Sequence, residues 1–477
     1  MAKRISRREM MRSIAAGGLV IAGSMTPLKS LLAAQRPMAK RGPQPPGPTV
    51  KRYPALMSDG KVIQPEREVE ILHKTGVLVV GGGPAGTAAA LSARRLGVDV
   101  TLVERYGYFG GLATGGLVLA IFPLYDRDNR QVIRGIGEEM MRRLDAIKFG
   151  IIERNKAPVY PTVDPEAFKY VLVEMVLESG LDAFLDCWGV DAILDSGGAV
   201  RGAVFESKSG RQAILADIVV DATGDGDIFA AAGAGFEKIK DTIGLVSRLG
   251  NVKVQDMLVG EHFKHTIGAR EETDTGDNGM PARGMPVRSF EGHVGSPTPA
   301  PGVNWINMKG PVGDALDIAD LSRMELLHRR ALWKNLEKAR KRKGAEEAFI
   351  VETAPQMGVR LSRLLAGVKK LTEEEMKAGA KFKDVIGYSG TYANAPEFQI
   401  PYGCLLPSKL ENLLAAGRCV SAEFIVADTL RLIPICWVTG QAAGIAAALS
   451  IKDKCKPREV NITKLQNQLK EQGVFLG

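Results

Sequence analysis

The chain has 477 residues, of which 45% are hydrophobic and 25% are charged, a composition typical of a globular protein with a large core. More than half of its formal charge of +9 falls on the first 34 residues, which hold six basic side chains and one acidic side chain. No basic stripe interleaved with aromatic residues follows, which argues against a nucleic-acid-binding protein.

The first 34 residues begin with a basic segment and continue into a weakly apolar one. Arg7 and Arg8 precede residues 13–25, which are rich in Ala and Gly, and the small residues at 31–34 suit a signal peptidase. Met10 stands where Phe or Leu is usual. The segment resembles a twin-arginine signal, which implies transport of the folded protein to the periplasm or exterior by the twin-arginine export machinery. The alternative is a basic start that contains Arg-Arg by chance.

Residues 35–68 are predicted to form a linker. The run at 41–48 is too rich in Pro and Gly to pack, and it indicates a semi-extended segment. We therefore expect the folded body to begin near residue 69.

A strand, a glycine turn and a helix follow in direct succession. The apolar run at 77–80 leads into a GxGxxG pattern at Gly81, Gly83 and Gly86, and an Ala-rich helix is expected from residue 87 to 96. The three glycines allow a tight turn, close approach of the backbone to a pyrophosphate, and close packing of helix on strand. The helix N-terminus then faces the phosphates.

A second strand, at 98–103, ends in Glu104 at the distance that a dinucleotide site requires. Its carboxylate can accept both ribose hydroxyls and would repel a 2′-phosphate, which disfavours NADP. The alternative is a solvated strand end beside Arg105. The candidate cofactor residues in this part of the chain are Gly81, Gly83, Pro84, Ala85, Gly86, Glu104 and Arg105.

Three later segments favour FAD over NAD. Residues 104–114 continue as a glycine-rich loop, residues 217–227 read as a strand and a turn, and residues 412–419 read as a strand entering a glycine turn before a helix at 434–450. The first turn of that helix would suit the negative charge of a reduced flavin. The candidate residues are Gly110, Gly111, Leu112, Ala113, Thr114, Asp221, Gly224, Asp225, Gly417, Arg418, Pro434, Gly440, Gln441 and Ala442.

Taken together, these segments resemble the broad family of FAD-dependent oxidoreductases with a glutathione-reductase-type fold. The resemblance rests on the GxGxxG start, the AGRC strand at 416–419 and the GQAAG helix at 440–444, and it covers roughly residues 74–450. It implies an α/β, Rossmann-like domain of three layers with a parallel sheet, interrupted by a substrate or cap domain. The expected parts are a signal at 1–34, a linker at 35–68, FAD-binding segments at 69–235 and 396–452, an insertion at 236–395 and a tail at 453–477.

Four residues are candidates for catalysis. Arg360 could hold a carboxylate or polarise a carbonyl, and Arg431 could stabilise an anionic flavin or bind an anionic substrate. Glu423 stands where the family pattern often has a histidine, and Tyr402 precedes the returning strands. The alternatives are ion pairing or capping for the arginines and a core position with a satisfied hydroxyl for the tyrosine. For Glu423, the alternative is that the proton chemistry takes place elsewhere.

Other chemistries are less favoured. The five cysteines are widely spaced and His262 and His265 are the only close pair of histidines, so no metal is expected. No cysteine precedes Cys187, which disfavours disulfide reductases, and no second glycine fingerprint occurs between residues 120 and 400. The electron partner is then a quinone, a redox protein, oxygen or the substrate alone.

The remaining segments bear on function less directly. We expect a basic amphipathic helix at 320–343, a surface loop or lid at 263–301, and a buried helix rather than a membrane span at 432–451. The sequence thus predicts an exported FAD-dependent dehydrogenase or reductase of a small organic molecule. The alternative is a non-catalytic flavin-binding electron carrier or assembly partner. The oligomeric state is left open.

Overall fold

The computed structural model describes residues 54–154, 160–255, 292–308, 310–392 and 395–477. The predicted export signal, the His262 and His265 pair and most of the predicted loop at 263–301 lie outside these residues. The elements up to residue 250 are β1 (Leu56–Ser58), β2 (Lys61–Ile63), β3 (Glu70–Val80), α2 (Pro84–Arg95), β4 (Val100–Val103), η2 (Gly111–Ala113), α3 (Ile136–Asp145), β5 (Ile151–Ile152), β6 (Thr162–Val163), α4 (Pro165–Ser179), β7 (Asp182–Phe184), β8 (Trp188–Leu194), β9 (Val200–Ser207), β10 (Gly210–Asp221), α5 (Asp227–Ala231), β11 (Phe236–Lys238) and β12 (Asp241–Gly250).

The later elements are β13 (Ser296–Pro297), β14 (Asn304–Met308), β15 (Val312–Gly313), α7 (Ile318–Ala339), β16 (Phe349–Thr353), β17 (Gly358–Val359), β18 (Arg363–Leu365), α8 (Glu373–Ala378), β19 (Val385–Tyr388), β20 (Gln399–Pro401), η3 (Tyr402–Leu405), β21 (Leu413–Ala415), α9 (Phe424–Leu430), α10 (Ile433–Asp453), η4 (Pro457–Glu459) and α11 (Ile462–Glu471).

A seven-stranded sheet brings the ends of four distant strands together. Strands β7, β4, β3, β10 and β21 are parallel, while β9 and β8 continue the sheet as an antiparallel extension beside the first half of β10. The register pairs Val80 at the end of β3 with both Val103 and Asp221, and Asp221 with Ala415. These carboxyl ends therefore lie side by side at one edge of the sheet. Sheets of this kind bind ligands in the crevice outside that edge.

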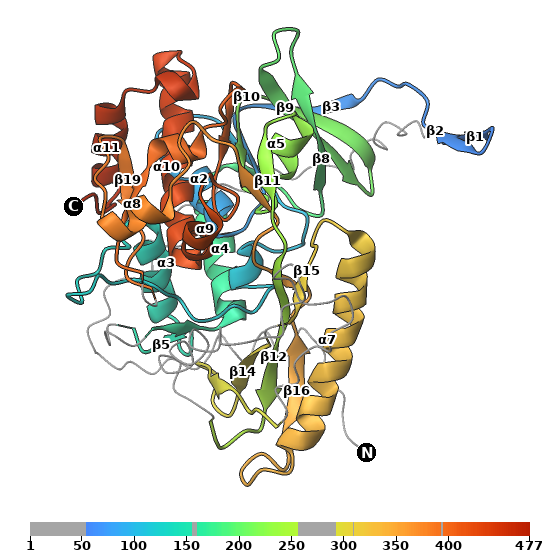
Figure 1. Ribbon diagram of the computed structural model, residues 1–477, viewed down its shortest axis with the longest axis vertical. Helices are drawn as coiled ribbons and strands as arrows, with labels where there is room; N and C mark the ends of the chain where they lie inside the picture. Colours follow the sequence, from blue (N-terminus) through green and yellow to red (C-terminus); the bar gives the residue numbers. More distant parts are fainter. Residues whose placement is uncertain (1–53, 155–159, 256–291, 309, 393–394) are drawn as a thin grey trace, which may run out of the picture. The chain divides into compact units, whose positions relative to one another are not determined.

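The two faces of this sheet are covered differently. Val77 and Val79 pack into the main core with α2 and α10, which lie against each other on one face (Figure 1). Leu78 and Val80 pack into a second core with Phe229 of α5 on the opposite face. The fold is thus α/β and Rossmann-like, as the sequence predicted, although its sheet is mixed rather than wholly parallel.

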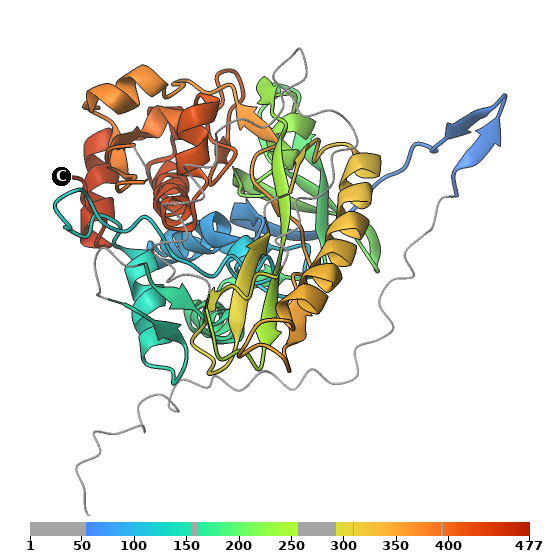
Figure 2. The same cartoon turned by 60° about the horizontal axis from the view of Figure 1, so that its bottom comes forward.

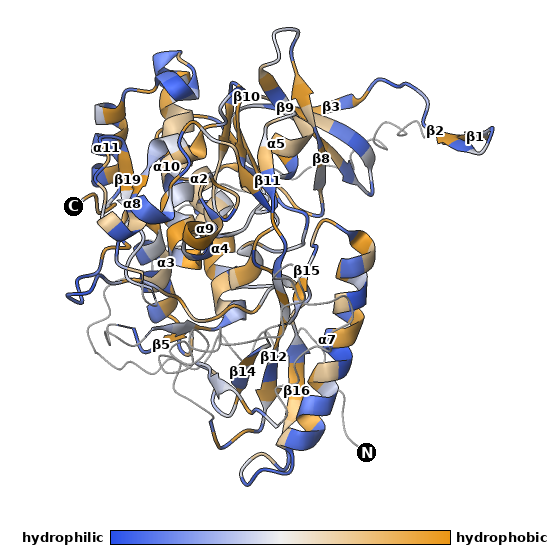
Figure 3. Ribbon diagram, viewed as in Figure 1, coloured by the Kyte–Doolittle hydropathy of each residue, from blue (hydrophilic) through white to orange (hydrophobic). Residues whose placement is uncertain are grey.

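A second sheet is built around β12. Strands β14, β15, β16 and β17 all pair with β12, and α7 lies along this sheet (Figures 1 and 2). The predicted basic amphipathic helix corresponds to α7, along which hydrophilic and hydrophobic residues alternate (Figure 3). Met324, Leu332, Leu336 and Ala339 are its buried apolar positions. Because side chains alternate along a strand, every second residue of β12 faces the same side of this sheet.

Helix α10 is long and apolar enough to cross a membrane by length and composition, but its apolar stretch is buried inside the described fold. Close contact with α2 explains its small residues. A Cβ on Gly440 would lie 2.1 Å from the Ala85 carbonyl oxygen, and one on Gly444 would lie 2.1 Å from the Ala89 carbonyl oxygen. The glycines of the GQAAG segment therefore serve helix packing.

Three segments differ in detail from the predicted division. The predicted linker contains the hairpin β1–β2. The predicted tail forms η4 and α11, and α11 packs against α10. Within the predicted insertion, β19 pairs with β20 and contacts α10, so residues 385–388 join the first domain. Strands β1 and β2 pair with each other through neighbouring residues, whereas α11 and β19 both pack against α10.

Candidate active site

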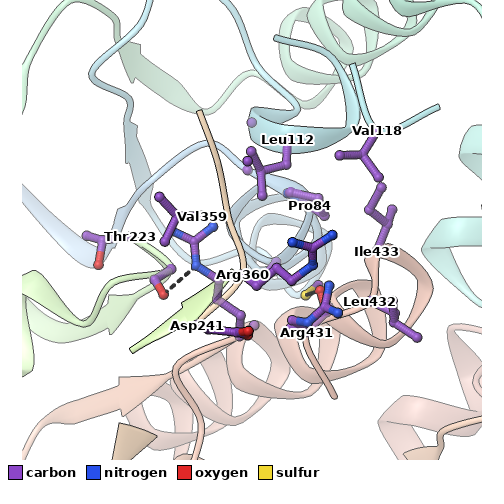
Figure 4. A pocket seen from close by; sticks show the side chains of 18 of the residues that line it. Pro84, Leu112, Val118, Thr223, Asp241, Val359, Arg360, Arg431, Leu432 and Ile433 are labelled. Carbon is purple, nitrogen blue, oxygen red and sulfur yellow. Dashed lines mark hydrogen bonds between the residues drawn. The ribbon is translucent and has the colours of Figure 1, made fainter. Parts of the chain in front are cut away.

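A cavity of about 840 Å³ begins at the carboxyl ends of the central strands and extends to the face of β12 (Figure 4). The ends of β3, β4, β10 and β21 line one part, and Thr242, Gly244 and Val246 of β12 line the other. The cavity is thus continuous from the glycine turn to the second sheet.

At each of its three positions, the turn needs glycine for a different steric reason. Gly81 has a φ of +102°, and a Cβ there would lie 2.4 Å from the Ala222 carbonyl oxygen. A Cβ on Gly86 would lie 1.6 Å from the Gly81 carbonyl oxygen. In contrast, a Cβ on Gly83 would meet nothing closer than the Gly111 Cα at 4.0 Å. The first and third glycines are required by the backbone, whereas Gly83 keeps the cavity open.

This turn leads into the N-terminus of α2. Gly83 is the N-cap and Pro84 the first helical residue, and neither a capping side chain nor an acidic residue occupies the first turn. Backbone amides there are available to an anion, and a pyrophosphate fits a helix terminus of this kind.

Glu104 connects the end of β4 to the glycine turn. Its Oε2 accepts the Gly82 N–H at 2.6 Å and its Oε1 accepts the Tyr106 N–H at 2.9 Å. Burial raises the pKa of the Glu104 carboxyl, although these backbone hydrogen bonds oppose the shift. Next to it, the Arg105 guanidinium lies over the rings of Tyr106 and Trp188, at 4.8 and 5.4 Å from their centroids. Carboxylate, cation and aromatic faces together suit an adenosine.

The turn after β10 is held by carboxylates that do not themselves line the cavity. Asp221 accepts N–H groups of Thr223, Ile228 and Phe229, and burial raises its pKa to about 6. Asp225 pairs with Arg418 at 2.8 Å. Burial raises the pKa of the Asp225 carboxyl, but the Arg418 charge and further hydrogen bonds outweigh it and lower the pKa overall.

Two guanidinium groups line the same cavity (Figure 4). Arg360 follows β17, and its Nη1 donates to the carbonyl oxygen and Oγ1 of Thr242 at 3.0 and 2.5 Å. Arg431 caps the C-terminus of α9 and donates through Nε and Nη2 to Oδ1 of Asp428, at 3.0 and 2.6 Å. Burial, followed by the Arg431 charge, lowers the pKa of Arg360 to about 10. Both remain cationic at neutral pH.

The structure brings many of the sequence-predicted residues to this cavity. Those that line it are Gly81, Gly83, Pro84, Ala85, Glu104, Arg105, Gly111, Leu112, Gly224, Arg360, Gly417, Arg418 and Arg431. Those outside its lining are Gly86, Gly110, Ala113, Thr114, Asp221, Asp225, Tyr402, Glu423, Pro434, Gly440, Gln441 and Ala442.

Several residues outside the lining have other contacts. The Tyr402 hydroxyl donates to the Pro457 carbonyl oxygen at 2.8 Å, and burial raises its pKa. Glu423 accepts the Glu373 N–H at 2.8 Å, and Gln441 accepts the Ile136 N–H at 3.1 Å. These side chains satisfy neighbouring polar groups, which leaves Arg360 and Arg431 as the sequence-predicted catalytic candidates at the cavity.

Sequence reasoning missed the residues that β12 and its flanks contribute. Lys240, Asp241 and Thr242 line the cavity from the second sheet, and Tyr392 and Trp188 line it from other segments. Asp241 is largely buried, and its Oδ2 has no hydrogen-bond partner within the described part of the chain. The only sequence signal was a polar cluster at the start of a strand, which is common on protein surfaces.

A model of the family described as "FAD dependent oxidoreductase" matches residues 76–469. A dihydrolipoyl dehydrogenase of Pseudomonas aeruginosa is 32% identical over 120 residues, which are 25% of this chain and 24% of that protein. The chain therefore aligns with about a quarter of the length of this curated relative.

Solved structures with similar folds cover more of the chain. A geranylgeranyl bacteriochlorophyll reductase-like protein of Thermoplasma acidophilum matches 84% of both chains with 14% identity and a TM-score of 0.42. The myxobacterial chondrochloren halogenase CndH matches 84% of this chain and 79% of its own, with 12% identity and a TM-score of 0.46.

Proposed function

The chain belongs to the family of FAD-dependent oxidoreductases, and we propose that it oxidises or reduces a small organic molecule between its FAD and the β12 sheet. The observation that carries this proposal is the single cavity. It joins the glycine turn, where a dinucleotide fits, to a charged chamber formed by residues of the second sheet. A flavin-binding carrier would not need such a chamber.

FAD is the cofactor, and the residues at the cavity fit its chemical parts. The open space at Gly83 and the α2 N-terminus suit the pyrophosphate, and Glu104 with Arg105 suits the adenosine. When bound, FAD supplies hydride and electron transfer, while the protein orients the substrate and sets the local charge. We propose that Arg360 and Arg431 orient the substrate and set the local charge.

The cofactor assignment is tested by flavin content and by one substitution. The purified protein should be yellow and release FAD on acid denaturation. Gly83→Val should abolish FAD binding while leaving the apoprotein folded, because the new side chain enters the cavity rather than the core. Colourless protein that FAD does not reconstitute, or normal flavin content in Gly83→Val, would contradict the assignment. A substrate screen by anaerobic flavin bleaching then tests the reaction.

We further propose that the protein acts in the periplasm or outside the cell, with a quinone or a redox protein as its electron partner. The support is the Arg7-Arg8 segment with its apolar run, and the lack of a second dinucleotide fingerprint in the sequence. Replacing both arginines with lysine keeps the charge but should block twin-arginine export. Undiminished export of that variant would contradict the proposal.

A further inference from the structure

Beside β12, the cavity contains a guanidinium that lacks a carboxylate partner among the described residues. Arg360 donates through Nη1 to Thr242, and no described carboxylate forms an ion pair with it. Its Nε and Nη2 groups therefore have no acceptor in the described part of the chain. Buried or half-buried charges of this kind are normally paired, because removing them from water without a partner is costly.

Two carboxylates, those of Asp241 and Asp428, act on the charge of Arg360 without forming an ion pair with it. Asp428 Oδ1 accepts from Arg431, and Asp241 Oδ1 accepts the Thr242 N–H at 2.6 Å, while Asp241 Oδ2 has no hydrogen-bond partner in the described part of the chain. Their charges act on Arg360 from a distance, since both favour its charged form while Arg431 opposes it. The protein thus holds two guanidinium groups close enough to repel each other, and it supplies a direct carboxylate to only one of them.

The walls around this pair are partly apolar. Phe122, Val246 and Met357 line the same cavity. Apolar walls exclude water and strengthen the interaction of a guanidinium with a bound anion. The planar fork of arginine matches a carboxylate, with two parallel N–H groups facing two oxygens.

We infer that Arg360, assisted by Arg431, binds the negatively charged group of the substrate, which is therefore a small organic acid that presents a carboxylate. This inference rests on the proposed function, because it assumes that FAD occupies the other part of the cavity. Arg360 belongs to the segment after β17 and hydrogen-bonds to β12, so it forms part of the second sheet's wall rather than of the glycine turn. The flavin itself is the competing anion, and the experiment separates the two.

The test measures the preference for carboxylates over their neutral amides. FAD-loaded protein is titrated calorimetrically with acetate, succinate and benzoate, each beside its amide. At least one carboxylate should bind about tenfold or more tightly than its amide, the size expected for one charge-assisted hydrogen bond. Arg360→Met should remove this preference. Arg360→Lys keeps the charge without the fork and should weaken carboxylate binding while retaining part of the preference.

Arg130→Met is the matched control, because Arg130 is exposed, pairs with Asp126 and does not line the cavity. It should keep the full preference. If Arg360→Met does not fold, the weakening in Arg360→Lys decides the question. The inference is overturned if no carboxylate is preferred, or if the preference survives in both Arg360 variants. A lowered flavin potential in Arg360→Met with an intact preference also overturns it, since Arg360 would then serve the cofactor.

The same samples distinguish this inference from the proposed function. Flavin content is measured in each by acid release. Protein that holds FAD but shows no carboxylate preference contradicts the inference alone. Protein that cannot hold FAD contradicts the proposed function, and the inference with it.

Discussion

Arg418 and Asp225 form a partly buried ion pair of 2.8 Å that joins the turn after β21 to the turn after β10. The Arg418 Nε also donates to the Gly224 carbonyl oxygen at 2.8 Å, and Ser362 donates to Asp225 at 2.6 Å. The pair therefore links two strand ends at the cavity to the segment that leads back from the second sheet. Removing one partner would leave a partly buried charge uncompensated.

Arg418→Met should accordingly lower the free energy of unfolding by about 3–5 kcal/mol. The double variant Arg418→Met/Asp225→Asn removes the orphaned charge and should recover much of this loss. Chemical denaturation of parent, single and double variants measures both effects. A single variant as stable as the parent would show that the pair does not hold these turns together.

The sequence predicted the part of this site that depends on local patterns. The glycine turn, Glu104 and the AGRC turn each sit beside a recognisable strand or helix, so their positions follow from neighbouring residues. Asp241 and Thr242 could not be found this way, because which face of β12 borders the cavity depends on packing against α7 and the first domain. Tyr402 is the opposite case, because the sequence predicted it at the site and the structure places it in the core. Its hydroxyl donates to the carbonyl oxygen of Pro457, which is distant in the sequence.

The contact between α2 and α10 predicts a strong steric effect in the GQAAG segment. Gly444→Ala places a methyl group 2.1 Å from the Ala89 carbonyl oxygen, so the helices must separate. We expect a loss of about 1–3 kcal/mol or more in the free energy of unfolding. Gly107→Ala is the matched control, because its nearest contact would be 3.6 Å away. Equal thermal stability of the two variants would contradict the close helix contact.

Asp221 gives the stability a defined pH dependence. Its pKa is about 6 in the folded protein against the ordinary value of 3.8, mainly because it is buried. The folded state then binds the proton more tightly than the unfolded state, so this group makes stability fall as the pH rises from about 4 to 6, by roughly 3 kcal/mol at most. Asp221→Asn lacks this titration. The stability of the parent relative to this variant should therefore fall over that interval and stay constant above it. A difference independent of pH would contradict the raised pKa.

The last prediction concerns the charge that Arg431 places beside α10. Arg431 lies at the end of α9, directly before Leu432 at the N-cap of α10, and all of Arg431, Leu432 and Ile433 line the cavity. If the flavin ring lies there, the guanidinium and the first amides of α10 both favour the negative charge of reduced FAD. Asp428 pairs with Arg431 and offsets part of this effect.

Arg431→Met should therefore lower the midpoint potential of bound FAD, and Asp428→Asn, which removes the opposing charge, should raise it. A change of about 1.4 kcal/mol corresponds to roughly 30 mV for a two-electron couple, so shifts of this order are measurable by dye equilibration at equal FAD occupancy. Opposite shifts in the two variants require the pair to act on the flavin electrostatically, because a purely structural disturbance has no reason to change sign. Unchanged potentials in both would place the ring away from Arg431, and Arg431 would then act only as the cap of α9.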